Sequence, residues 1–578
     1  MHVFRVWAPF AKKMAVQAGD VRADLQGPDE YGWWSAAVPS AGPGTDYGFV
    51  IDDEERPYPD PRSRCQPNGV HGLSRVYDQS QFAWSDAGFQ ASPLAEGILY
   101  ELHVGTFTPQ GTLDSAIEKL DALKDLGITH VELMPVAAFA GRHGWGYDGV
   151  SLFAVHQPYG GPDALKRFVD AAHRRGLAVL LDVVYNHFGP AGNYTGKYGP
   201  YTTELHHTPW GGAVNLEDAW SVEVRRFFCD NALMWMRDFH MDGLRLDAVH
   251  AFVDRSAIHF LEQLTHETDE LEAALGRPLV LIAESDLNDP RLVTATEAGG
   301  YGMDAQWSDD FHHALFAVLA HEPQGGYYID FGSMEQLKKS IEETFVYDGK
   351  YAKHRKRMHG RPAAHVSPHR FLGYIQNHDQ IGNRAVGDRL HHEVGLDRAM
   401  VAAAVVLTAP FIPMIFQGEE WAASAPFQYF ADHDDRELAR QVSEGRRREF
   451  AHFGWDPADF PDPEKKETFE RSKLAWAEAD SGEHERMLAW YKALIRLRRT
   501  SPALNDGRPG QVRVTCDAAE RWMRMKRGNI ELLCNLGERL VRLAVDGSAS
   551  LLLKSRADAV LSGGSITLPP DTAAILGI

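Results

Sequence analysis

Residues 243–250 read GLRLDAVH and place a cation and a carboxylate within an apolar stretch. Alternate side chains of a β-strand point to the same face, so Arg245 and Asp247 are predicted to lie together. A guanidinium beside a carboxylate favours the ionised form, and only the ionised form acts as a nucleophile. A structural ion pair at a strand end has the same pattern. The segment by itself therefore leaves both interpretations open.

This segment is one of eight strand-like apolar runs in the central part of the chain. The runs begin at Ile98, Ile128, Leu177, Gly243, Leu279, Asp304, Phe371 and Pro410. Helical patterns lie between most of them, and two of these helices, ending at Gly127 and Gly176, lead directly into the next strand. Eight strands that alternate with helices predict a parallel (β/α)8 TIM barrel. An open doubly wound sheet is the alternative, but no glycine-rich phosphate-binding motif follows a strand.

The sequences on either side of this region read as short strands punctuated by turns. Residues 1–90 predict an N-terminal, immunoglobulin-like β-sandwich, and residues 505–578 predict a C-terminal β-sandwich. Residues 91–504 are assigned to the barrel, with a helical excursion expected at about 422–482. A long segment rich in Gly, Tyr and Pro, residues 188–219, interrupts the barrel pattern. Loops of this length in a compact domain are usually functional, although both interruptions can also be ordinary surface insertions.

The composition excludes several classes of partner. The chain has 578 residues, of which 44% are hydrophobic and 24% charged, and its formal net charge is −21. Nucleic acids and anionic membranes bind basic surfaces, so neither is expected as a partner. The four cysteines show no metal-type spacing, and we find neither a signal peptide nor an apolar run long enough to cross a bilayer. The expected location is the cytoplasm.

The predicted strand ends carry many acids, amides and histidines, and in a barrel these ends form the active site. They include Asp182, Asn186, His187, Arg245, Asp247, Glu284, Asp309, Asp310, His312, His313, Asn377, His378 and Asp379. Burying ionisable groups is costly, so such a set points to function more than to structure. A metal site is the chemical alternative, but Arg245 in the middle of the set would repel a cation, and no HExxH-type ligand pair occurs. We therefore expect neither a metal nor a cofactor.

Glycosyl transfer is the chemistry that needs two carboxylates and no cofactor. One carboxylate must be anionic to attack the anomeric carbon, and Asp247 beside Arg245 suits this nucleophilic role. The other must donate a proton, and Glu284 follows an apolar strand, where desolvation raises the pKa of a carboxyl group. Asp379 is predicted to stabilise positive charge on the sugar ring. The same sugar is predicted to contact three more side chains, each of which also has a structural interpretation: Tyr147, His187 and His378.

Four motifs, in this order, resemble the four signature regions of the α-amylase family of glycoside hydrolases. They are DVVYNH (182–187), GLRLDAVH (243–250), AES (283–285) and NHD (377–379). The resemblance implies the same three roles for Asp247, Glu284 and Asp379, with retention of anomeric configuration. It also implies that no metal takes part in catalysis and that the N-terminal sandwich is of the carbohydrate-binding-module type.

Further segments resemble one branch of that family, among them DPRSRCQPNGVHG (60–72), QWSDDFHHAL (306–315) and QNHDQIGNR (376–384). This branch hydrolyses the α-1,4 bond next to the terminal trehalose of maltooligosyl trehalose, in trehalose biosynthesis. The resemblance implies a maltooligosyl trehalose synthase as functional partner, and it places an aromatic wall at Trp210, which can equally be a loop-packing residue. The substrate-binding residues that follow are Tyr147, His187, Trp210, Arg245, His250, Asp309, Asp310, His312, His313, His378, Gln380 and Asn383.

Two alternatives stay open at this stage. A glycogen branching or debranching enzyme of the same family would use the same three acids with another acceptor or leaving group. A non-catalytic, carbohydrate-binding barrel would have lost at least one of the acids, and all three are present.

Overall fold

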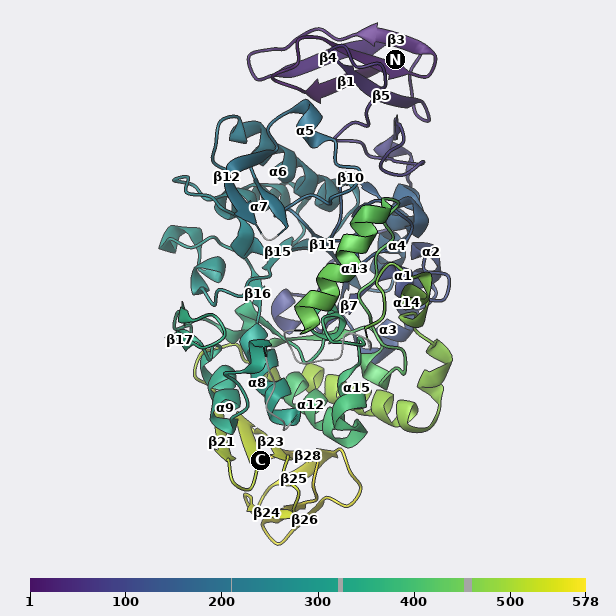
Figure 1. Ribbon diagram of the computed structural model, residues 1–578. Helices are drawn as coiled ribbons and strands as arrows, with labels where there is room; N and C mark the ends of the chain where they lie inside the picture. Colours follow the sequence, from purple (N-terminus) through teal and green to yellow (C-terminus); the bar gives the residue numbers. More distant parts are fainter. Residues whose placement is uncertain (209, 321–325, 452–459) are drawn as a thin grey trace.

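Eight parallel strands close into a barrel at the centre of the computed structural model, which describes residues 1–208, 210–320, 326–451 and 460–578 (Figure 1). In order around the barrel the strands are β7 (Leu99–Leu102), β8 (His130–Leu133), β11 (Ala178–Val183), β14 (Gly243–Leu246), β15 (Val280–Ala283), β16 (Ala305–Trp307), β19 (Phe371–Gly373) and β20 (Ile412–Phe416). Each strand lies within one of the eight predicted apolar runs. The predicted TIM barrel is therefore confirmed, and the open doubly wound sheet is excluded.

Helices cover the outside of the barrel, and most of them return the chain from one parallel strand to the next. The main ones are α4 (Gly161–His173), α6 (Ser221–Asp238), α7 (Phe260–Leu275), α8 (Asp309–Ala320), α12 (Leu396–Thr408) and α15 (Gly482–Thr500). The helical pattern that ends at Gly127 forms two shorter helices, α2 (Leu113–Ile117) and α3 (Leu120–Leu126). Gly127 has a φ of 103°, a left-handed conformation that glycine adopts readily, so the helix ends where the pattern predicts.

Antiparallel sheets lie on two opposite sides of the barrel, above and below it in Figure 1. At the N-terminal end β1 (His2–Trp7) pairs with β4 (Trp33–Val38), and a second sheet contains β3 (Val21–Asp24), β2 (Met14–Ala18), β5 (Asp46–Ile51) and β6 (Ser74–Arg75). At the C-terminal end a five-stranded sheet contains β21 (Val512–Asp517), β22 (Trp522–Arg527), β23 (Ile530–Asn535), β28 (Thr572–Gly577) and β25 (Ser550–Lys554). A three-stranded sheet contains β24 (Val541–Ala544), β27 (Ser565–Leu568) and β26 (Val560–Ser562). The domain boundaries after residues 90 and 504 stay predictions.

Three insertions extend from the barrel towards its mouth. The long segment 188–219 forms a hairpin of β12 (Thr202–Thr208) and β13 (Gly211–Val214), and β17 (Asp348–Ala352) forms a second hairpin with β18 (Arg357–Gly360). The excursion after β20 contains α13 (Arg436–Ala451) and α14 (Lys466–Arg471), while its residues 452–459 lie outside the described part of the chain. Helix α13 runs across the front of the barrel in Figure 1. Within the described residues, no helix combines the length and the apolar character needed to cross a membrane.

His173, a buried histidine at the end of α4, binds the segment that connects the N-terminal sheets with the barrel. His173 Nδ1 lies 2.8 Å from Asp86 Oδ2 in that connection, and His173 Nε2 lies 2.9 Å from Asp242 Oδ2 at the start of β14. Both ring nitrogens donate only when the imidazole is protonated. Burial lowers the pKa of His173, but its hydrogen bonds to Asp242 and Asp86 outweigh this effect, so the net pKa is raised. His240 also pairs with Asp86, and Arg277 pairs with Asp242.

The raised pKa of His173 makes part of the stability pH-dependent. Its proton contributes stability that is fully present below the ordinary histidine pKa of about 6.5 and is lost as the pH rises through the raised folded-state pKa. We expect His173→Gln to lower the free energy of unfolding by about 3 kcal/mol at acidic pH, because it removes one partner of a buried ion pair. Urea unfolding of both proteins across the pH range should show this difference shrinking at alkaline pH.

The exposed pair between His266 and Glu270 supplies the control, and His266→Gln should change the stability little at any pH. A stability difference between His173→Gln and the parent protein that does not vary with pH would contradict the protonated bridge.

Candidate active site

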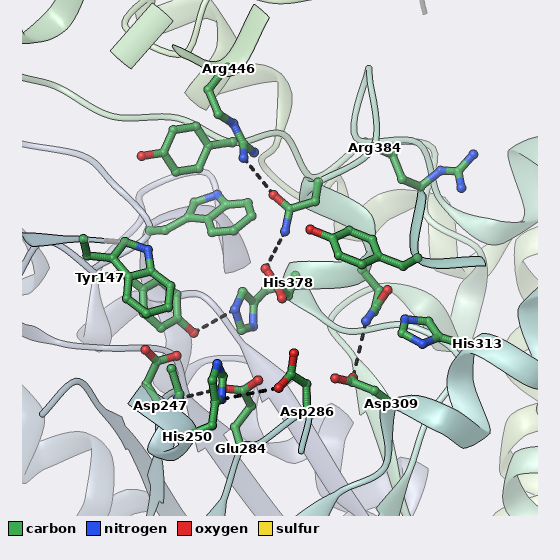
Figure 2. Close-up of a pocket in the computed structure, with 18 of the residues that line it drawn as sticks. Tyr147, Asp247, His250, Glu284, Asp286, Asp309, His313, His378, Arg384 and Arg446 are labelled. Atoms are coloured by element: carbon green, nitrogen blue, oxygen red, sulfur yellow. Dashed lines mark hydrogen bonds and ion pairs between the residues drawn. The ribbon is translucent and has the colours of Figure 1, made fainter. Parts of the chain in front are cut away.

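A cleft of about 780 Å³ opens at the carboxyl ends of the barrel strands, where TIM barrels carry their active sites. Asp247 directly follows β14, Glu284 directly follows β15, and Asp379 lies on α10 (His378–Gly382), which follows β19. All three carboxyl groups line the cleft. Figure 2 shows Asp247 and Glu284 at its base, with the His250 side chain drawn between them in this view. The barrel therefore brings together three acids that are far apart in the sequence.

Both oxygens of the Asp247 carboxylate accept hydrogen bonds. Arg245 Nη1 donates to Oδ1 at 2.8 Å, and Asn186 Nδ2 donates to Oδ2 at 2.8 Å. The predicted common face of Arg245 and Asp247 is therefore observed. The same Arg245 Nη1 lies 2.8 Å from Asp182 Oδ2, so one guanidinium forms ion pairs with carboxylates from two neighbouring strands. The two donors together fix the orientation of the Asp247 carboxylate.

Glu284 has the opposite environment. Only 16% of its side chain is exposed, and burial raises its pKa well above the ordinary value, against the opposing effect of Arg245, which lies 3.8 Å away. The charges of nearby acids, Asp247 among them, raise it further. The Ala248 N–H donates to Glu284 Oε2 at 2.6 Å. Ala248 has a φ of 42°, which is rare for a residue other than glycine. This left-handed turn points the N–H of Ala248, the residue after Asp247, at the carboxyl group of Glu284.

A chain of hydrogen bonds connects His378 to the same guanidinium. His378 Nδ1 lies 2.5 Å from Glu101 Oε1, and His378 Nε2 lies 2.8 Å from the Tyr147 hydroxyl. Tyr147 donates to Asp182 Oδ2 at 2.6 Å, and Asp182 pairs with Arg245. Burial lowers the pKa of His378, but the Glu101 carboxylate outweighs it, so the net pKa is raised. Tyr147 and His378 are thereby held rigidly at the cleft wall.

Most of the predicted substrate-binding residues line the cleft: Tyr147, His187, Trp210, Arg245, His250, Asp309, His313, His378, Gln380 and Asn383. The indole of Trp210 is 49% exposed and stacks on the His187 ring with 5.4 Å between centroids, at the tip of the β12–β13 hairpin. This position is compatible with the predicted aromatic wall.

Two predicted residues, Asp310 and His312, do not line the cleft, and for them the prediction is corrected. Successive residues of an α-helix are rotated by about 100°, so Asp309 at the start of α8 faces the cleft while its neighbour turns into the protein. The Asp310 carboxylate accepts hydrogen bonds from the backbone N–H groups of Val346 and Tyr347 at 2.7 and 2.8 Å. His312 is buried, and its ring nitrogen lies 3.1 Å from the Tyr328 hydroxyl. His312 therefore contacts the cleft wall from behind, through Tyr328.

The sequence patterns missed a set of cleft residues that come mainly from loops and insertions: Trp145, Asp148, Asp286, Tyr327, Tyr328, Arg355, Arg384, Glu393, Tyr429, Phe430 and Arg446. Asp286 pairs with Arg355 at 2.6 Å and lies 3.9 Å from His250, which makes one corner of the cleft densely charged. The position of Asp286, two residues after Glu284, could have identified it from the sequence. The cleft residues in the insertions had no sequence signal beyond a local density of charged and aromatic residues. Among the described residues, no group of three or more His, Cys, Asp or Glu side chains is arranged to hold a metal ion.

Known proteins share this architecture. Residues 64–201 match the profile described as "Alpha amylase, catalytic domain", and residues 507–575 match a domain of unknown function, DUF3459. The crystal structure of a putative alpha amylase from Salmonella typhimurium is similar over 100% of this chain and 97% of its own, with a TM-score of 0.91 and 37% sequence identity. Together with the cleft and its acids, these likenesses define a glycoside hydrolase of the α-amylase class.

The relatives narrow this class. A malto-oligosyltrehalose trehalohydrolase from Rhizobium sp. (strain M-11) is 49% identical over 99% of this chain and 97% of its own length. One from Arthrobacter ramosus is 52% identical over 86% of this chain and 87% of its own. The chain belongs to the malto-oligosyltrehalose trehalohydrolase family. A 1,4-alpha-glucan branching enzyme from Corynebacterium jeikeium is more distant, at 29% identity over 72% of this chain and 60% of its own length.

The stability of the site depends on Arg245, which faces carboxylates on three strands. We expect Arg245→Gln to lower the free energy of unfolding by about 3–5 kcal/mol, because it leaves buried carboxylates without their cation. Adding Asp182→Asn should recover part of the loss, since one uncompensated charge is removed. Urea unfolding of the two single variants and the double variant measures this coupling.

Arg255, whose side chain is 72% exposed in its pair with Glu217, provides the matched control, and Arg255→Gln should cost at most about 1 kcal/mol. Strictly additive effects of Arg245→Gln and Asp182→Asn would show that the two groups do not depend on each other.

Proposed function

We propose that the protein hydrolyses the α-1,4-glucosidic bond next to the terminal trehalose of maltooligosyl trehalose, releasing trehalose with retention of configuration. The proposal depends above all on the contrast between two neighbouring acids: Asp247 has both oxygens bound by donors, whereas Glu284 is mostly buried and has a raised pKa. This is the division between nucleophile and proton donor that retaining glycosidases require. The family supplies the substrate, because its members carry trehalohydrolase activity in their name.

In the first step an Asp247 oxygen attacks the anomeric carbon of the glucose that precedes the trehalose unit. The bond from this carbon to the bridging oxygen breaks, and Glu284 transfers its proton to that oxygen, so trehalose departs as a neutral alcohol. In the second step Glu284, now a carboxylate, takes a proton from water as the water oxygen attacks the same carbon. Asp247 is released, and two successive inversions give net retention.

The remaining cleft residues are assigned supporting roles. Asp379 stabilises the positive charge that develops on the sugar ring. Tyr147 and His378, fixed by their hydrogen-bond chain, bind the sugar that undergoes attack. Trp210 with His187 forms an aromatic wall for apolar sugar faces. Hydroxyl groups elsewhere along the substrate are assigned to Arg245, His250, Asp309, His313, Gln380 and Asn383.

Substrate supply and location follow from the same proposal. The substrate must come from an enzyme that converts the end of a malto-oligosaccharide into a trehalose unit, which is the role of a maltooligosyl trehalose synthase. We infer a cytoplasmic location, because all four cysteines are unpaired, as in proteins of reducing compartments.

Product analysis separates this function from that of a branching or debranching enzyme. We expect incubation with maltooligosyl trehalose to yield free trehalose and a shortened malto-oligosaccharide, and incubation with linear amylose to introduce no branches. Chromatography of both reactions makes the comparison. Branch formation without trehalose release would favour the distant branching-enzyme likeness instead.

Removing the nucleophile should abolish turnover in a diagnostic way. We expect Asp247→Ala to lower kcat for trehalose release by on the order of 1,000-fold or more, while the far-ultraviolet circular dichroism stays unchanged. Added azide should restore part of the reaction, because the smaller side chain leaves room for an external nucleophile. Its product should be a β-glycosyl azide, since a single displacement inverts the α-configured carbon.

The exposed Asp20 supplies a control, because Asp20→Asn should turn over at the parental rate. Undiminished turnover by Asp247→Ala, or an α-glycosyl azide as the rescued product, would rule out Asp247 as the nucleophile.

The raised pKa of Glu284 predicts the alkaline limit of activity. The first step needs protonated Glu284, so kcat/KM should fall as the pH rises through this raised pKa. Asp309 contributes to the elevation by charge repulsion, after burial, which is the largest cause. We expect Asp309→Asn to move the alkaline limb of the kcat/KM profile to lower pH, and Asp20→Asn to leave it in place. A limb that does not move in Asp309→Asn would contradict this assignment of the limb to Glu284.

A further inference from the structure

Helix α13 belongs to the insertion after β20 and lies across the mouth of the barrel (Figure 1). It carries several arginines, which differ in their surroundings. Arg440 pairs with Glu437 and Glu444 on the exposed side of the helix, and Arg447 is exposed. Arg446 is half-buried and lines the cleft, and Figure 2 shows its side chain pointing down towards the acids. The proposed mechanism gives this residue no role.

Arg446 is connected to the carboxylate of Asp379 through one side chain. Arg446 Nη1 donates to Asn383 Oδ1 at 2.9 Å, and Asn383 Nδ2 donates to Asp379 Oδ1 at 2.5 Å. In Figure 2 a dashed hydrogen bond runs down from the labelled Arg446 side chain. The guanidinium of Arg446 also lies 4.3 Å from the ring centroid of Tyr429, another residue of the cleft wall.

The direction of these hydrogen bonds follows from the chemistry of the groups. A guanidinium has only donors, so the amide of Asn383 must turn its oxygen towards Arg446. The NH2 group at the other end of the amide then faces Asp379, which as a carboxylate has only acceptors. Without Arg446 the amide can rotate and present its oxygen to the carboxylate, which would repel it. The cation also polarises the amide and strengthens the second hydrogen bond.

Arg446 also supports the short helix that carries Asp379. Helix α10 has only five residues, and its first turn is capped by the Asn377 side chain, which accepts from the Gln380 N–H at 2.7 Å. At the other end Arg446 Nη2 donates to the Gly382 carbonyl at 3.3 Å. A cation at a helix C-terminus satisfies a free carbonyl and interacts favourably with the helix dipole.

We propose that Arg446 is a positioning residue that links helix α13 above the cleft to the orientation and charge of the Asp379 carboxylate, through Asn383. This inference rests on the proposed function, in which Asp379 stabilises the charged sugar ring. It gives the insertion after β20 a part in the reaction as well as in forming the cleft wall.

The test replaces Arg446 by Met, which keeps the length of the side chain and removes the donors, and by Lys, which keeps a cation. For Arg446→Met we expect kcat for trehalose release to fall by about 10- to 100-fold with a smaller change in KM, because a small misplacement of a catalytic group has this effect. Removing a donor chain raises the pKa of a carboxylate, so the acidic limb of the kcat/KM profile should move to higher pH. Arg446→Lys should restore part of both changes.

Arg447→Met, one position along the same helix on its exposed side, is the matched control and should behave as the parent protein. Asn383→Leu removes the relay while leaving Arg446 in place, so it should show the same shift of the acidic limb, and the double variant with Arg446→Met should lose little more. If Arg446→Met does not fold, the acidic limb of the kcat/KM profile in Asn383→Leu and in Arg446→Lys tests the positioning role of Arg446.

The outcomes separate the two proposals. A parent protein that releases no trehalose from maltooligosyl trehalose refutes the proposed function. An active parent whose Arg446→Met and Asn383→Leu variants keep the parental kcat and acidic limb overturns the positioning role alone. Full additivity of the two substitutions also overturns it, because the relay requires them to act through the same carboxylate.

Discussion

A single buried guanidinium holds the catalytic centre together. Arg245 is 2% exposed and faces Asp182 on β11, Asp247 after β14 and Glu284 after β15. So many acids cannot share a water-poor space unless a cation compensates them, because burying unpaired charge is costly. The Trp307 ring, 4.2 Å from the guanidinium carbon, covers the cation from another side and adds a cation–π contact. The same cation also gives the two acids different environments, since it hydrogen-bonds Asp247 directly but lies 3.8 Å from Glu284.

The barrel and its insertions contribute different parts of the site. The strand ends supply Asp247 and Glu284, whose positions follow from eight short parallel strands and one left-handed alanine. The walls of the cleft come from longer excursions: the β12–β13 hairpin with Trp210, the β17–β18 region with Arg355, and α13 with Arg446. In the proposed function, bond breaking therefore depends on the barrel, and recognition of the terminal trehalose depends on the loops. A shared barrel can serve different substrates when its loops differ.

The fold and the central chemistry could be predicted from local pattern. All eight strands lie inside the predicted runs, and the three acids line one cleft, because parallel strands in a barrel must end at a common mouth. The predictions were wrong where the direction of a side chain depends on the three-dimensional structure. Asp310 and His312 are neighbours of cleft residues in the sequence, but the helical rotation of α8 turns both into the protein. Arg446 was missed because its partner Asn383 is 63 residues away in the chain.

The sequence by itself determined the barrel, the pairing of Arg245 with Asp247, and a carboxyl group, Glu284, at the end of an apolar strand, because each depends on short-range alternation and on the polarity of adjacent residues. Only the tertiary structure decided which insertions reach the cleft. It also placed Arg446 above Asp379 and brought His173 between Asp86 and Asp242. These contacts join segments whose separation in sequence carries no periodic signal. Their geometry depends on how long loops fold back over the barrel, and a local pattern contains no information about that path.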